Sequence, residues 1–175
     1  VVLDVCGAGA TDLRDEKSAE LLKEARIDIL KGNASEIARV SGAGVKTRGV
    51  DAARVEEDLC QIATTLTKKY GSTVVITGKE DIVADGNRTF FIRNGHPLMA
   101  SIVGTGCMAT SVIGAFAAVE NDLSLASAAA LVAFEVAAEC SAARSIGPAA
   151  FKAKLFDCMY ALDKKTIDLR QKVWI

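Results

Sequence analysis

The chain repeats one pattern that strongly limits its fold: a short apolar run, a glycine-containing loop, and then a helical pattern. Residues 1–6 (VVLDVC) form the first run, and residues 7–11 (GAGAT) separate it from a helical pattern near residues 16–26. A second run at 27–30 precedes residues 31–36 (KGNASE) and another helical start. Strands that alternate with helices form mainly parallel sheets with helices on both faces. The pattern therefore predicts a layered α/β fold.

The rest of the chain continues this alternation. Gly71 ends a long helical pattern, and the β-branched run at 73–77 (TVVIT) is typical of a strand buried on both faces. Residues 81–84 and 89–93 flank the turn-forming sequence DGNR and predict a hairpin. Three further helical patterns lie near residues 106–120, 123–144 and 148–163. Ligands of such sheets bind at the carboxyl ends of the strands, where the glycine loops fall.

Composition narrows the class of protein. The 175 residues suit one domain spanning 1–175, and 50% of them are hydrophobic, with a mean hydropathy of +0.26. Lys and Arg number 21 against 22 Asp and Glu, without a basic stripe, which argues against nucleic acid. The five cysteines form no CxxC pattern, which favours a reducing cytoplasm. The apolar run at 123–143 contains Glu135 and Glu139, so we expect no membrane span.

One glycine turn stands before a helical pattern and ends on a thiol. Gly104-Thr105-Gly106 can form an anion site, because backbone N–H groups at a helix start lack intrahelical partners. The alternative is a tight turn that needs glycine for its conformation. Cys107 follows in the first turn, where the helix dipole favours a thiolate, although most lone cysteines are inert core residues. The only histidine, His96, is more typical of a loop histidine than of a partner for a cysteine nucleophile.

Polar side chains also follow the predicted strands. Asp4 and Glu36 lie at strand–loop junctions, where carboxylates can hold Mg²⁺ through water. A turn aspartate and a capping-box glutamate, paired with Asn33, are the alternative interpretations. Thr77-Gly78 ends the buried strand at the same edge, and it could simply be a strand terminus.

Taken together, these motifs resemble the hydroxyethylthiazole kinase family, thiamine-salvage members of the ribokinase-like superfamily. The segments that carry the resemblance are residues 3–4, 7–11, 32–37, 77–81, 94–99 and 104–107. The resemblance implies a kinase that uses ATP and Mg²⁺ to phosphorylate the primary hydroxyl of 4-methyl-5-(2-hydroxyethyl)thiazole. It also implies a homotrimer whose active sites lie between subunits. The chain corresponds to the C-terminal two-thirds of the family's domain, and the N-terminal part of the fold is expected to be absent.

The resemblance assigns roles at the reacting end of the site. Most ribokinase-like enzymes have aspartate as the base at the end of the glycine turn, and the thiazole kinases have cysteine, so Cys107 is the candidate base. Gly104, Thr105 and Gly106 match the anion hole, and Gly104 also matches a substrate contact. Val103 departs from the family, which usually has threonine there.

The resemblance also assigns the nucleotide end. Asn33 and Glu36 match the Asn-x-x-Glu motif of the Mg²⁺ and phosphate network, and Asp4 matches the metal-side aspartate. Thr77 with Gly78 matches an ATP contact. Lys31 stands where the family usually has arginine, and it can meet a phosphate only as a point charge.

Two other functions stay open at this point. The first is a related kinase for hydroxymethylpyrimidine or pyridoxal, although such relatives are expected to have aspartate at position 107. The second is a non-catalytic module for nucleotide binding or assembly, which the short chain and the changes at Val103 and Lys31 motivate. Turnover that depends on ATP and Mg²⁺ separates the enzyme from this module.

Overall fold

The computed structural model describes residues 1–42 and 52–175, and side chains from residue 59 onward in the second range. The chain forms two compact units: residues 1–90 together with Ile175, and residues 91–174. The strand β5 (Thr89–Ile92) crosses this division.

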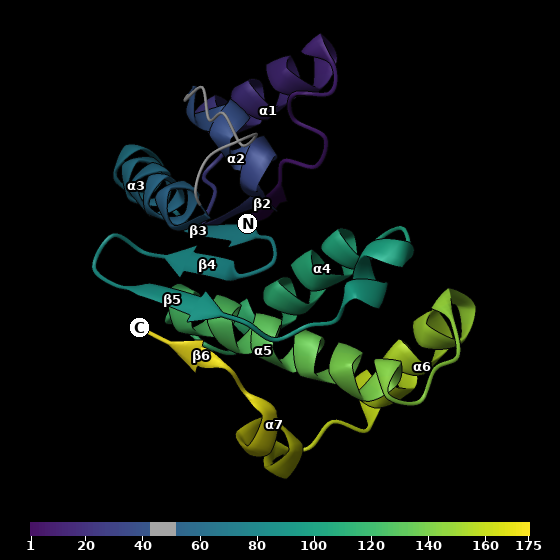
Figure 1. Ribbon diagram of the computed structural model, residues 1–175. Helices are drawn as coiled ribbons and strands as arrows, with labels where there is room; N and C mark the ends of the chain where they lie inside the picture. Colours follow the sequence, from purple (N-terminus) through teal and green to yellow (C-terminus); the bar gives the residue numbers. More distant parts are fainter. Residues whose placement is uncertain (43–51) are drawn as a thin grey trace. The chain divides into compact units, whose positions relative to one another are not determined.

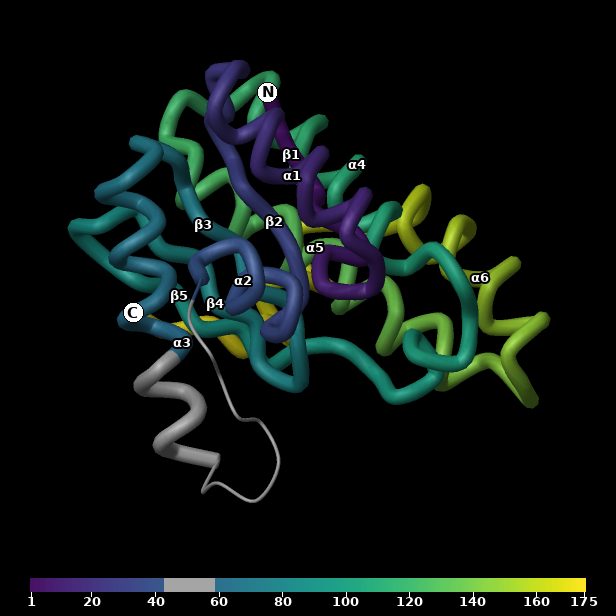
Figure 2. Tube along the Cα trace, turned by 90° about the horizontal axis from the view of Figure 1, so that it is seen from above, coloured from purple at the N-terminus to yellow at the C-terminus, as the bar shows by residue number. Residues whose placement is uncertain are grey.

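The first unit contains four strands whose pairing changes direction along the sheet. β1 (Val2–Asp4), β2 (Ile29–Asn33) and β3 (Thr73–Thr77) pair in parallel and lie side by side in Figure 2. β4 (Asp81–Ala84) pairs antiparallel with β3. Their buried apolar side chains are Ile29, Leu30, Val74, Val75, Ile76, Ile82 and Val83.

Three helices belong to this unit and gather on one side of its strands in Figure 1: α1 (Asp12–Glu24), α2 (Ala34–Ser41) and α3 (Ala52–Tyr70). Thr11 caps α1 by accepting a hydrogen bond from the Arg14 amide. α2 packs on β2, and α3 packs on β3 and β4. β1 therefore leads through a loop into the capped helix α1, and β2 leads directly into α2, which Asn33 caps.

The second unit is mainly helical: η1 (Pro97–Ser101), α4 (Thr105–Ala117), α5 (Leu123–Ala142), α6 (Pro148–Tyr160) and α7 (Lys164–Arg170). α5 is mostly buried and packs against α4, α6 and α7. Among the described residues, α5 alone is long and apolar enough to cross a membrane, but 72% of that window is buried, and core helices meet the same criteria. β6 (Val173–Trp174) pairs antiparallel with β5, where Phe91 and Trp174 stack.

The predicted α/β class is confirmed, with two differences in detail. The sheet expected to be mainly parallel is mixed, because the chain returns from β3 to β4 through a turn too short for a parallel connection. The second strand occupies Ile29–Asn33 instead of residues 27–30. α7 and β6 were not predicted from the sequence, although Asp163 caps α7 through the Thr166 amide and could have indicated its start.

Candidate active site

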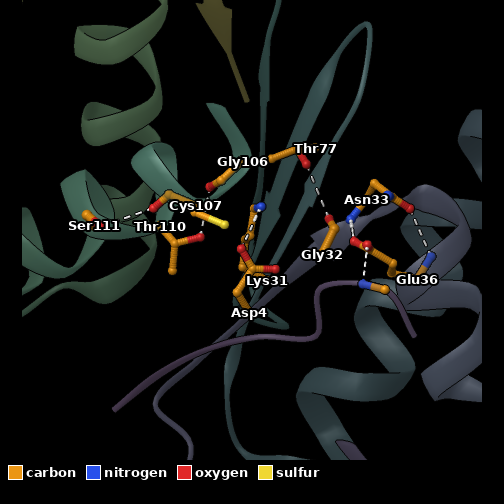
Figure 3. A network of polar contacts seen from close by, with 11 residues as sticks. Asp4, Lys31, Gly32, Asn33, Glu36, Thr77, Gly106, Cys107, Thr110 and Ser111 are labelled. Atoms are coloured by element: carbon orange, nitrogen blue, oxygen red, sulfur yellow. Dashed lines mark hydrogen bonds and ion pairs between the residues drawn. The ribbon is translucent and has the colours of Figure 1, made fainter. Parts of the chain in front are cut away.

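An ion pair lies at the carboxyl end of β1. Asp4 ends this strand and is the register partner of Lys31 on β2. The Lys31 ammonium lies 3.0 Å from Asp4 Oδ2, and the two side chains are only 4% and 14% exposed. Figure 3 shows this contact between the neighbouring strands. The structure therefore places the predicted metal-side carboxylate beside the predicted nucleotide-binding cation.

Glu36 connects two backbone segments through its two oxygens. Asn33 caps α2 by accepting the Glu36 amide at 2.9 Å, and Glu36 Oε2 accepts the Asn33 amide at 2.7 Å. This reciprocal pair confirms the capping box expected from the sequence. Glu36 Oε1 accepts the Gly7 amide at 2.8 Å, so the same carboxylate also holds the loop after β1.

Gly32 allows the close packing beneath this junction. A Cβ at position 32 would lie 3.0 Å from a Val5 methyl and 3.2 Å from both Glu36 Cβ and an Ile37 side-chain carbon. Any larger residue would push α2 away from β2. The Thr77 hydroxyl at the end of β3 reaches the Gly32 carbonyl at 3.5 Å. The Gly32 backbone thus lies between the ends of β1 and β3.

Gly78 follows Thr77 in the turn to β4. Its amide donates to Asp81 Oδ1 at 2.8 Å, which fixes the turn. The strand ends at Thr77, directly before Gly78, and the predicted contact of Gly78 with ATP stays a prediction.

The loop after β1 is held by interactions that the sequence analysis missed. The Gly9 amide donates to Asp15 Oδ1 at 2.6 Å, and Arg39 pairs with Asp15 Oδ2 at 2.6 Å. The hydrogen bond from Arg39, followed by that from Gly9, lowers the pKa of Asp15 below its usual value. Arg14 Nη1 donates to the Cys6 carbonyl at 2.7 Å. Gly7 and Gly9 adopt positive φ angles, which glycine takes without strain, and these angles allow the loop to turn.

In the second unit, α4 begins directly after a left-handed glycine. Gly104 is its N-cap with φ +100°, and no side-chain cap is present there among the described residues. The first amides of a helix have no intrahelical acceptor, so an uncapped start presents donors and partial positive charge to an anion. The Thr105 hydroxyl instead donates to the Met99 carbonyl at 3.2 Å. Thr105 therefore ties η1 to the start of α4.

Cys107 lies exposed in the first turn of α4. The Thr110 and Ser111 hydroxyls each donate at 3.0 Å to the carbonyls four residues earlier, those of Gly106 and Cys107, as Figure 3 shows. His96 caps η1, since its Nδ1 accepts the Leu98 amide at 3.2 Å. The expectation of a loop histidine with a structural partner is confirmed, which leaves little support for cysteine hydrolase chemistry.

Asn94, in the segment that leads to η1, is the centre of a second network that the sequence analysis did not predict. Its Nδ2 donates to Glu139 Oε1 at 3.0 Å and to the Arg170 carbonyl at 2.8 Å, while its Oδ1 accepts the Lys172 amide at 2.7 Å. Lys172 Nζ also lies 2.9 Å from Glu139 Oε1. Asn94 thus fastens the C-terminal segment to α5.

The donor chemistry of the first unit suits Mg²⁺. Among the described residues there is no group of three or more His, Cys, Asp or Glu that could hold a metal by themselves. Mg²⁺ needs no such group, because it uses one or two carboxylates, water and phosphate oxygens. Asp4, at the carboxyl end of a parallel strand, fits this donor set, although the Lys31 ammonium lies on it in this structure. The two Glu36 oxygens accept the Gly7 and Asn33 amides, and the metal role of Glu36 stays a prediction.

The first unit brings Asp4, Lys31, Asn33, Glu36, Thr77 and Gly78 to the ends of its parallel strands. The second unit carries Gly104, Thr105, Gly106 and Cys107 at the start of α4. These features define an α/β protein: the first unit carries carboxylates at strand ends, where ligands of such sheets bind, and the second carries a glycine-led helix start of the kind that binds phosphate.

Comparison with known proteins specifies the class. The model of the hydroxyethylthiazole kinase family matches residues 1–165, and the chain belongs to that family. Hydroxyethylthiazole kinase from Methanosarcina mazei is 47% identical over 173 residues, which cover 99% of this chain and 66% of the relative. The enzyme of the same name from Methanosarcina acetivorans is 48% identical, over 95% of this chain and 64% of the relative. The chain thus spans somewhat less than two-thirds of these relatives.

A solved structure has the same fold. That of hydroxyethylthiazole kinase from Pyrococcus horikoshii OT3 matches with a TM-score of 0.88 and 38% identity, over 99% of this chain and 64% of that one. The fold predicted from the family resemblance is therefore confirmed for the part that this chain contains.

Proposed function

We propose that this chain contains the phosphoryl-transfer residues of a hydroxyethylthiazole kinase, which transfers phosphate from ATP to the primary hydroxyl of 4-methyl-5-(2-hydroxyethyl)thiazole. The observation that carries the proposal is the start of α4, where Gly104 leaves the helix without a side-chain cap and Cys107 is exposed on the first turn. Membership of the family and the relatives' names support the substrate.

Gly104, Thr105 and Gly106 act as an anion hole in this proposal. Phosphoryl transfer passes through a loose transition state, so positioning and charge stabilisation provide most of the rate. Backbone amides at the start of α4 stabilise the charge on the transferred group, and Gly104, without a side chain, allows the thiazole alcohol to approach. The hydroxyl of Thr105 holds η1 in place through the Met99 carbonyl.

Cys107 takes the proton from the attacking hydroxyl in the same proposal. Its place on the first turn, directly after the glycine turn, puts the exposed thiol beside the proposed anion hole. Because the transition state is loose, a base of modest strength is sufficient.

The strand ends of the first unit provide the nucleotide residues. Lys31, Asn33, Thr77 and Gly78 contact ATP, and Asp4 and Glu36 hold Mg²⁺. Lys31 offers a single positive charge to a phosphate, and Asn33 and Glu36 keep the α2 start and the Gly7 loop in fixed positions. When bound, Mg²⁺ would neutralise charge on the phosphate oxygens.

Family membership also motivates proposals about assembly and location. We propose a cytoplasmic homotrimer with active sites between subunits. Exposed Phe156 and Tyr160, one helical turn apart on α6, give a surface that an assembly could cover. Light scattering tests this, because a trimer has three times the 18.4 kDa mass of the chain.

The deciding experiment measures phosphorylation of the thiazole alcohol with ATP and Mg²⁺. It compares this chain with a version extended to the length of the relatives, and includes hydroxymethylpyrimidine and pyridoxal as competing acceptors. We expect the extended form to phosphorylate the thiazole alcohol in preference to hydroxymethylpyrimidine and pyridoxal, whether or not the shorter chain is active. Phosphorylation of another acceptor instead would identify the related kinase class, and ATP binding without turnover in folded protein would identify a non-catalytic module.

A further inference from the structure

Lys31 occupies an unusual position for a lysine. It lies on β2, where Ile29, Leu30 and Gly32 are also buried and only Asn33 at the end is exposed, and its side chain is 4% exposed. Lysine is almost never fully buried unless it is paired, because removing its charge from water is costly. Its ion pair with Asp4 at 3.0 Å offsets part of this cost.

The sheet fixes this pair rather than leaving it to side-chain flexibility. Lys31 is the register partner of Asp4 on one side and of Val75 on the other. Residues in register on neighbouring strands point to the same face of a sheet. The ammonium is therefore a cation that the fold itself places on the Asp4 carboxylate.

We propose that Lys31 is a positioning residue that competes with divalent cations for Asp4. Without nucleotide, its ammonium balances the carboxylate and keeps divalent-cation affinity low. The phosphates of the nucleotide then attract the ammonium, and Asp4 becomes available to the cation that arrives with them. This step rests on the proposed function, because it assumes that Asp4 belongs to a metal site for a nucleotide complex.

Simple electrostatics gives the direction of the effect. An ammonium beside a carboxylate cancels most of its charge and repels a dication at the same oxygen atoms. Removing one partner of a buried ion pair leaves the other with an uncompensated charge. A variant without the ammonium should therefore bind a divalent cation more tightly at Asp4. Lysine suits a move from the Asp4 carboxylate to a phosphate, because its charge is compact and its side chain is flexible. Arginine would hold the carboxylate through two parallel hydrogen bonds in a rigid geometry.

The test uses Mn²⁺ alone, with bound metal measured by electron paramagnetic resonance in the absence of nucleotide. We expect Lys31→Met to bind Mn²⁺ at least about tenfold more tightly than the wild type at low salt. Lys31→Arg, which keeps the positive charge, should bind no more tightly than the wild type. Adding Asp4→Asn to Lys31→Met should remove the gain. Circular dichroism confirms folding, and if Lys31→Met does not fold, Lys31→Gln carries the same expectation.

Two results would overturn the inference. One is Mn²⁺ affinity in the neutral variant that equals or falls below that of the wild type. The other is a gain that persists when Asp4 is also replaced. Because no acceptor or ATP is present, the gain can appear even if the thiazole proves to be the wrong substrate. Conversely, thiazole phosphorylation without the gain would reject the competition and leave the proposed function in place.

Discussion

At the scale of single residues, several of the candidate side chains in each unit hold the backbone in place. Glu36 uses both oxygens for the amides of Gly7 and Asn33, and Thr105 uses its hydroxyl for Met99. Cys107 is exposed at a helix start. Under the proposed function, we therefore expect transfer to depend most on the backbone of the glycine turn and less on any one side chain.

Substitutions in the glycine turn test this order of importance. We expect Gly106→Val, which crowds the anion hole, to lower kcat by about 10²–10³-fold. Cys107→Ala should lose less and keep measurable activity, because the loose transition state asks little of a base. Steady-state kinetics on folded variants with the thiazole alcohol provide the measurement. A larger loss in Cys107→Ala than in Gly106→Val would contradict this division.

Replacing Cys107 with a different proton acceptor tests its proposed role as the base. Cys107→Asp should remain active, because a carboxylate can accept the same proton and is the usual base of the superfamily that the sequence resembles. Turnover of this variant is compared with that of Cys107→Ala at the same enzyme concentration. Complete loss of turnover in folded Cys107→Asp would count against Cys107 as the base.

Thiol reactivity gives a pH-dependent prediction. Burial raises the pKa of the Cys158 thiol, whereas Cys107 is exposed. At pH 8 we therefore expect iodoacetamide to modify Cys107 at least about tenfold faster than Cys158, as measured by peptide mass spectrometry. Because the folded protein favours the neutral Cys158 thiol, this thiol contributes fully to the free energy of unfolding at neutral pH. That contribution is lost as the pH rises from the pKa of an unfolded thiol through the higher pKa of the folded one. Equal labelling rates in native protein would show that Cys158 is not protected.

At the scale of secondary-structure elements, caps and short-range signals explain most of the boundaries. Asn33 and Glu36 begin α2 as a capping box, Asp122 caps α5 through the Leu125 amide, and His96 caps η1. The sequence predicted only the first of these caps, although each of the three needs only residues two or three positions apart. The end of the chain was missed because its two-residue strand depends on pairing with β5.

The Asn94 network provides a test at this scale. Asn94→Ala removes one acceptor and two donated hydrogen bonds that join α5, the end of α7 and Lys172. We expect a loss of about 1–3 kcal/mol in the free energy of unfolding, measured by urea denaturation. Asn87→Ala, in an exposed turn, serves as the control and should change stability by less than about 0.5 kcal/mol. Equal effects of the two substitutions would show that the network contributes nothing specific.

At the scale of the whole molecule, α5 supplies a buried apolar surface to several other helices. Its alanines allow close approach, and its larger apolar residues fill the remaining volume. The sequence alone left two interpretations of this helix, an interface or the interior of the chain. Its burial against α4 and α6 favours the interior.

Two leucines of α5 form a matched pair for testing this burial. Leu131 is 1% exposed and Leu125 is 43% exposed. We expect Leu131→Ala to lower the free energy of unfolding by about 2–5 kcal/mol, because it leaves a cavity in the core. Leu125→Ala should cost about 0.5 kcal/mol or less. Thermal and urea unfolding measure both, and a similar cost for the two would mean that α5 is not a core helix.

The sequence by itself determined the α/β class, the glycine turns, the capping box and the family, because each depends on residue types within a few positions or on motif order. Only the tertiary structure decided which of these groups meet. Lys31 meets Asp4 across 27 positions, Glu36 meets Gly7 across 29, and Asn94 meets Lys172 across 78. Such contacts depend on strand register and helix packing, and one residue of slippage between β1 and β2 would turn Lys31 to the other face of the sheet from Asp4.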